Sequence, residues 1–120
     1  MASAIPVIEQ IHLGFAFLVL LCALLLGWVQ LGRRVMIALI GVQFLIGIIY
    51  AALLGRATPP DVLWHVLGAV LATVAYVAGR RLGDRSTSPA VPIALSLLGL
   101  VLLIGTAYVG VHMHDVSAHA

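Results

Sequence analysis

Four long apolar stretches constrain this sequence more than any other feature. The first, from Ile5 to Leu31, is longer than the ~20 residues that a helix needs to cross the core of a bilayer. Over its 120 residues the chain is 63% hydrophobic and 8% charged. A water-soluble domain of this length has too little interior to bury so much apolar surface. The sequence therefore predicts an all-α integral membrane protein, folded as a four-helix transmembrane bundle.

Polar and helix-breaking residues mark the ends of the predicted helices. Arg33 and Arg34 lie in a short first connection, and Thr58 before Pro59 is typical of a helix N-terminus. The most polar stretch, residues 80–89, forms the third connection. We predict a single transmembrane domain over residues 1–120, with helices over residues 6–31, 35–55, 59–79 and 90–111.

The placement of arginine predicts the orientation of the chain. Five of the six arginines fall in the first and third connections, and the chain has no lysine. Positively charged residues are enriched in cytoplasmic loops. We therefore expect these connections to lie inside a bacterial-type inner (plasma) membrane, with both termini on the outer, periplasmic side.

A proline followed six residues later by a histidine occurs twice, as Pro6 with His12 and as Pro59 with His65. Because proline favours the first helical position, each histidine should lie about 9 Å inside its helix. The repeat predicts two pseudo-symmetric helical hairpins. Ionisable residues at membrane depth are functional candidates, and histidines on two helices can ligate the iron of a b-type haem from both sides.

Small residues accompany both histidines at helical spacing. Ala16 follows His12 on one helix, and Gly68 and Ala72 follow His65 on another. Such stripes leave room for a flat macrocycle, so we predict that these residues line a haem site. The alternative is that the stripes only permit close helix packing, while the histidines hydrogen-bond to neighbouring helices.

Glu9 is the candidate catalytic residue. It lies three residues before His12, and therefore one turn outward on the same helix face. Its carboxylate could accept a hydrogen bond from the imidazole or act on a substrate at the mouth of the site. The alternative is an acid placed in the first turn because the helix dipole favours it there.

The C-terminal segment offers a second group of candidate ligands. His112 and His114, with Asp115 and His119 nearby, could hold copper or zinc at the membrane surface. One of these side chains could also replace a haem ligand. The alternative is an exposed polar tail, in which histidine near a helix C-terminus is electrostatically favourable.

The Glu9-x-x-His12 motif, the VQFLIG segment and His65 together resemble one half of the haem A synthase family, over about Ile8 to Val77. In that family each half is a four-helix bundle in which histidines on alternate helices bind haem. The resemblance implies that His12 and His65 are haem ligands and that Glu9 is the acid associated with chemistry on the haem. Leu13 stands where the family motif has arginine, so the resemblance implies a shared bundle design more than shared catalysis.

We therefore expect a small membrane protein that binds haem b and serves electron transfer or haem handling, in or beside a respiratory or photosynthetic complex. The expected partners are the lipid bilayer, other membrane subunits or a second copy of the chain, and a quinone, but no nucleic acid. We do not expect a stand-alone enzyme, although haem A synthase-like oxygenation is one alternative. The main alternative is a cofactor-free accessory subunit of a large energy-transducing complex. The sequence has no glycine-rich phosphate loop that would indicate a nucleotide-driven transporter.

Overall fold

The structure, a computed structural model, describes residues 4–85 and 88–119, and it places side chains at these positions except at residues 57 and 114–119. The described residues are helical throughout, apart from short connections, so the predicted all-α class is confirmed. The elements are α1 (Ala4–Leu26), α2 (Gln30–Leu54), the single 3₁₀ turn η1 (Gly55–Ala57), α3 (Val62–Arg85) and α4 (Ala90–His119). Each of the four α-helices is long and apolar enough to cross a membrane.

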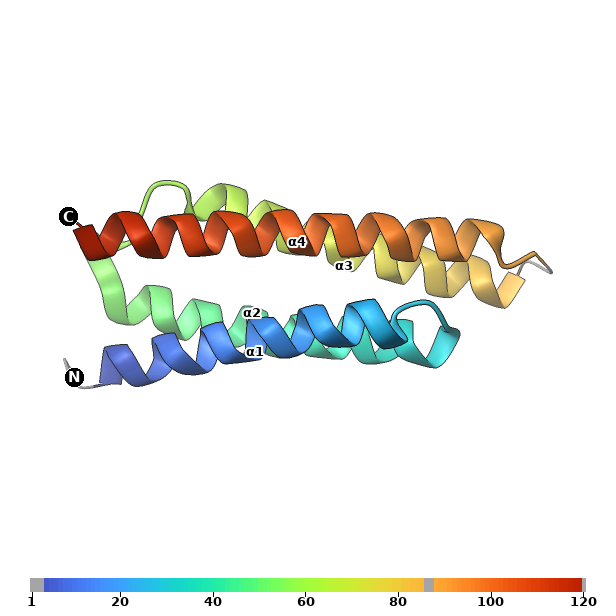
Figure 1. The fold of residues 1–120 in the computed structure, drawn as a ribbon, viewed down its shortest axis with the longest axis horizontal. Coiled ribbons are helices and arrows are strands. Elements are labelled where there is room, and N and C mark those ends of the chain that lie inside the picture. Colours follow the sequence, from blue (N-terminus) through green and yellow to red (C-terminus); the bar gives the residue numbers. More distant parts are fainter. Residues whose placement is uncertain (1–3, 86–87, 120) are drawn as a thin grey trace.

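The helices form two antiparallel hairpins that lie against each other. Helix α1 packs mainly on α2, and α3 packs mainly on α4, while α2 and α3 make the main contact between the hairpins. Figure 1 shows the hairpins as two layers of an elongated bundle, with both termini at the same end. The principal extents of the bundle are 52 × 20 × 19 Å.

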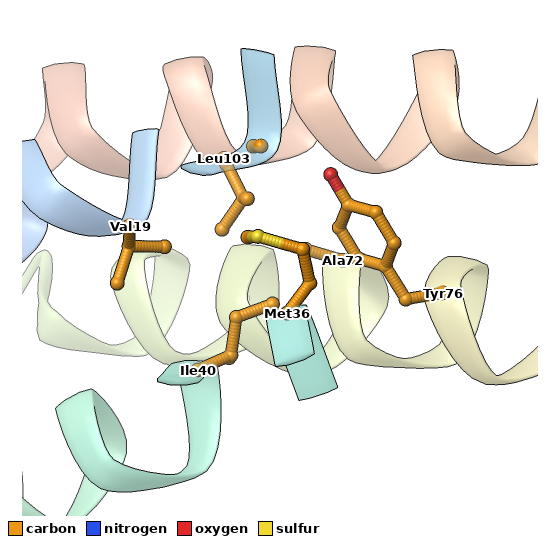
Figure 2. Close-up of a cluster of buried hydrophobic side chains, with 7 residues drawn as sticks. Val19, Met36, Ile40, Ala72, Tyr76 and Leu103 are labelled. Carbon is orange, nitrogen blue, oxygen red and sulfur yellow. The ribbon is translucent and has the colours of Figure 1, made fainter. Parts of the chain in front are cut away.

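All four helices contribute to one small core near the middle of the bundle. Its buried members are Val19 and Ala23 of α1, Met36 and Ile40 of α2, Ala72 and Tyr76 of α3, and Leu103 of α4. Figure 2 shows the Met36 side chain lying between Leu103, Ile40 and Tyr76. Most other apolar side chains point outward, as expected when lipid rather than protein covers a helix.

The first connection differs from the prediction, because it falls at residues 27–29 and not at residues 32–34. The Trp28 indole donates a 2.6 Å hydrogen bond to the carbonyl oxygen of Leu24, which satisfies a carbonyl at the end of α1. A Cβ atom at Gly32 would overlap the backbone of Leu26, so the turn closes tightly against the start of α2. Arg33 and Arg34 therefore belong to α2.

Helix α3 also begins and ends later than predicted, at Val62 and Arg85. The Thr58 hydroxyl does not cap α3 but donates to the carbonyl oxygen of Gly55 in η1 at 2.8 Å and to that of Ala51 in α2 at 3.3 Å. Pro60 disfavours a helical conformation at the proline before it, which delays the helix. Gly79, the predicted helix end, is buried against the Arg33 side chain, so it serves packing and does not terminate the helix.

Candidate cofactor site between the hairpins

A cavity of about 270 Å³ lies between the two hairpins, towards the end of the bundle that carries both termini. Residues from all four helices line it, and most of them are apolar. His12, His65 and Glu9, which the sequence singles out, all lie on its wall. A mostly apolar cavity with a few convergent polar groups is typical of a cofactor or ligand site.

The two predicted histidines lie close together across this cavity. His12 comes from α1 and His65 from α3, and their ring centroids are 6.1 Å apart with an interplanar angle of 77°. Both side chains are half-buried. The structure thus brings together two imidazoles that stand 53 positions apart in the chain.

A backbone carbonyl group holds the ring of His65. Its Nδ1 atom lies 2.9 Å from the carbonyl oxygen of Thr106 on α4. Because a carbonyl oxygen can only accept, the proton of the neutral ring belongs on Nδ1, and Nε2 carries the lone pair. Histidines that bind a metal are commonly fixed in this way by a hydrogen bond from the other ring nitrogen.

His12 is held through Gln43 of α2. The Gln43 amide donates a 2.7 Å hydrogen bond to the backbone carbonyl oxygen of His12, so it bridges two helices as polar residues in membranes often do. The Nδ1 atom of His12 and the Oε1 atom of Gln43 are both buried and have no hydrogen-bond partner. An imidazole N–H and an amide oxygen are complementary, and a bond between them would leave Nε2 of His12 for a ligand.

A glycine from the second helix of each hairpin makes room for each imidazole. A Cβ atom at Gly47 would lie 3.1 Å from Cε1 of His12, and one at Gly110 would lie 2.9 Å from Cε1 of His65. Both glycines have φ in the ordinary helical range, since Gly55 alone among the described residues has a positive φ. These glycines serve the site because they lack a side chain that would crowd the imidazoles, and not because of their backbone freedom.

Residues at equivalent positions of the two hairpins line the cavity in pairs. His65 follows His12 by 53 positions, whereas Gly110 follows Gly47 by 63 positions. The same two offsets relate other residues that line the cavity: Ala16 with Ala69, Ile40 with Leu103, Gln43 with Thr106, and Tyr50 with Met113. This relation supports the prediction of two pseudo-symmetric hairpins.

The polar groups break this symmetry, because Glu9 and Tyr50 occur in the first hairpin and have no polar counterparts in the second. The Tyr50 hydroxyl donates a 2.9 Å hydrogen bond to Oε2 of Glu9. The Tyr50 ring also stacks on His12, with centroids 6.2 Å apart and an interplanar angle of 19°. Their counterparts in the other hairpin, Val62 and Met113, are apolar. Glu9 is thereby linked to the His12 ring through Tyr50.

The other predicted site residues have different surroundings. Ala16 lines the cavity. Ala72 belongs to the central core, and a Cβ atom at Gly68 would overlap the Thr106 side chain of α4. The positions of Gly68 and Ala72 therefore agree with the close-packing alternative for the stripe on α3.

Of the C-terminal histidines, only His112 has a described side chain, and it does not line the cavity. His112 is exposed on α4, and the side chains of His114, Asp115 and His119 lie outside the described residues. Among the side chains that the structure places, no group of three or more histidine, cysteine, aspartate or glutamate residues could hold a metal ion.

Sequence reasoning missed several residues of the site. Tyr50, Gly47, Thr106 and Gly110 were not predicted as site residues from the sequence. The stacking of Tyr50 on His12 depends on how α2 rotates against α1, for which a single apolar sequence carries no signal. An alignment of the two hairpins helix by helix would have paired Gly47 with Gly110, which lie 63 positions apart.

Comparisons of the chain with protein-family models, with curated proteins and with solved structures gave no match. The resemblance to haem A synthases therefore stays a prediction from the residues that carry it. Because one fold hosts many functions, the function is best argued from the site itself.

Proposed function

We propose that this chain is a small integral membrane protein that binds one haem b between His12 and His65. The observation that carries the proposal is the meeting of two imidazoles from equivalent positions of the two hairpins, with ring centroids 6.1 Å apart. A cofactor that takes one ligand from each side would suit this pair, since each hairpin would then supply one ligand.

The separation of the rings fits a single metal ion between them. A histidine nitrogen binds a metal at about 2.0 Å, so two imidazoles on opposite sides of one ion have their ring centres about 6 Å apart. The bond between His65 and the Thr106 carbonyl leaves the Nε2 lone pair of His65 available. The buried, unpaired Nδ1 of His12 has a complementary partner in Gln43. The residues present therefore fit bis-histidine ligation.

Haem suits this pair better than a bare metal ion does. Structural zinc takes four protein ligands and catalytic zinc takes three, whereas the macrocycle of haem supplies four nitrogens and asks the protein only for axial ligands. When bound, haem supplies one-electron redox chemistry. The chain itself would supply the two histidine ligands, the apolar lining of the cavity and the polar group formed by Glu9 and Tyr50.

Electron transfer or haem handling beside a respiratory or photosynthetic complex is the role that follows. The four helices account for nearly all described residues, so a soluble partner would find little surface outside the membrane. A membrane subunit, a second copy of the chain or a quinone is the expected partner. Exposed Arg34 lies near the start of α2, and exposed Arg81 and Arg85 lie near the end of α3. These helix ends are at the end of the bundle opposite both termini (Figure 1), which supports a cavity near the outer face of a bacterial-type inner membrane.

Haem titration of the detergent-purified protein tests this proposal. We expect saturation at one haem per chain, and a loss of affinity greater than about a hundredfold in His12→Ala and in His65→Ala. The matched control is His112→Ala, which removes an exposed histidine near the same end and should leave the affinity unchanged. Equal titration curves for all four proteins would contradict the proposal and would favour a cofactor-free accessory subunit.

A further inference from the structure

A buried arginine lies at the end of the bundle away from the haem site. Arg33 of α2 is only 4% exposed, although it carries a full positive charge. It donates hydrogen bonds from Nε to the Ser96 hydroxyl of α4 at 2.8 Å, from Nη1 to Oε1 of Gln30 at 2.9 Å, and from Nη2 to the carbonyl oxygen of Trp28 at 3.0 Å. The bond to Ser96 joins the two hairpins at this end, whereas Gln30 and Trp28 belong to the same hairpin as Arg33.

All three partners of Arg33 are electrically neutral. The acid in this network, Asp84, accepts a 2.7 Å hydrogen bond from Gln30 and not from Arg33. A guanidinium group has five N–H donors, so two remain after the three bonds. Because a buried charge without a counter-charge is costly, an anion beside Arg33 would stabilise this end of the bundle.

A cavity of about 430 Å³ adjoins the arginine and could admit such an anion. Arg33, Trp28 and Gln30 line one side, and Pro89 and Pro92 line the other. Two helix N-termini also meet there, since α2 begins at Gln30 and α4 begins next to Pro89. The positive end of a helix dipole favours anions, and phosphate groups most commonly.

We infer that this cavity binds a phosphate group through the buried Arg33, and that the phosphate belongs to the headgroup of an anionic lipid. The position near the ends of three membrane-spanning helices places the cavity at the depth of lipid headgroups. Exposed Arg34, Arg81 and Arg85 make the same end of the bundle positive, which attracts anionic lipids. The planar guanidinium fork matches the geometry of a phosphate.

The test compares Arg33→Gln with Arg34→Gln, which removes the same charge from the exposed neighbouring residue. Each detergent-purified protein is equilibrated with equal amounts of phosphatidylglycerol and phosphatidylcholine, and native mass spectrometry counts the retained lipids. We expect the wild-type protein to retain at least about ten times more phosphatidylglycerol than phosphatidylcholine. This ratio corresponds to the free energy of one charge-assisted hydrogen bond. Arg33→Gln should bring this ratio near one, and Arg34→Gln should change it less than about threefold.

A second arm separates a lipid from a soluble anion. Thermal unfolding of the wild-type protein in phosphatidylcholine is measured with and without inorganic phosphate. Stabilisation by phosphate without any preference for phosphatidylglycerol would keep the phosphate site but assign it to a soluble anion. If Arg33→Gln does not fold, Arg33→Lys replaces it and should lower the lipid ratio by losing the fork. The inference is overturned if the wild-type protein shows neither a preference for phosphatidylglycerol nor stabilisation by phosphate. It is also overturned if Arg34→Gln lowers the lipid ratio as much as the Arg33 variant does, or if Arg33→Lys keeps the wild-type ratio.

Discussion

His65 is the more firmly held of the two candidate ligands. Its Nδ1 atom bonds to a helix carbonyl oxygen, and Gly110 leaves just enough room for the ring. A carbonyl group within a helix cannot rotate away as a side chain can, so the direction of the His65 lone pair is fixed by the packing of α3 on α4. His12 depends instead on the side chains of Gln43 and Tyr50.

Gly110→Ala should therefore weaken haem binding without removing a ligand. The added Cβ atom would lie 2.9 Å from Cε1 of His65 and would displace the ring. We expect a loss of affinity of about tenfold to a hundredfold, as when an outer partner of a metal ligand is lost. The matched control is Gly105→Ala on the same helix, where an added Cβ atom meets nothing within 4 Å. Equal haem affinities of the two variants in titration would exclude a role for Gly110 in holding His65.

Glu9→Gln should leave haem binding intact. The amide oxygen of glutamine can still accept the hydrogen bond of the Tyr50 hydroxyl, so the stacking of Tyr50 on His12 is kept. Glu9→Leu removes this acceptor and should lower the stability by about 1–3 kcal/mol. Thermal unfolding and the haem spectrum of both variants check this. A haem-free Glu9→Gln protein would show that the carboxylate charge itself is required for binding.

At the scale of the helices, the packing of α3 on α4 relies on Gly68. A Cβ atom there would overlap the Thr106 side chain, and the carbonyl oxygen of Thr106 holds His65. We expect Gly68→Ala to lower the stability by about 1–3 kcal/mol through overpacking and to weaken haem binding as α4 moves away. The control is Gly14→Ala on α1, where an added methyl group meets nothing within 4 Å. A thermal midpoint of Gly68→Ala equal to that of the control would contradict this packing argument.

The existence of the helices could be predicted from the sequence, and so could the start of α4 at Ala90, whereas several other helix ends could not. Apolar runs of bilayer length leave helices as the only structure that satisfies the backbone, so four spans follow from composition alone. The ends were misplaced where a residue serves packing and not termination. Gly79 resembles a helix end but packs on Arg33, and Arg33 resembles a loop residue but is buried against Ser96.

The molecule as a whole consists of two similar helical hairpins that pack against each other. Residues at equivalent positions of the hairpins meet at both ends of the bundle. His12 faces His65 at one end, and at the other end Arg33 bonds to Ser96, which follows it by 63 positions. The histidine pair was predicted because each histidine follows a proline by six residues, although only Pro6 lies inside its helix, since α3 begins at Val62 and so after Pro59. The partners from α2 and α4 were not, because the longer second hairpin shifts the offset from 53 to 63. A search for a repeat with the fixed offset of 53 therefore relates α1 to α3 but misses the relation of α2 to α4.

The absorption spectrum of the purified wild-type protein, oxidised and then reduced with dithionite, tests the proposed bis-histidine haem most directly. We predict sharp α and β bands on reduction, as expected for a low-spin iron with His12 and His65 as its two axial ligands, and a loss or shift of these bands in either single alanine variant. A high-spin spectrum would leave only one histidine on the iron. A protein that stays colourless even after haem is added would contradict the central proposal.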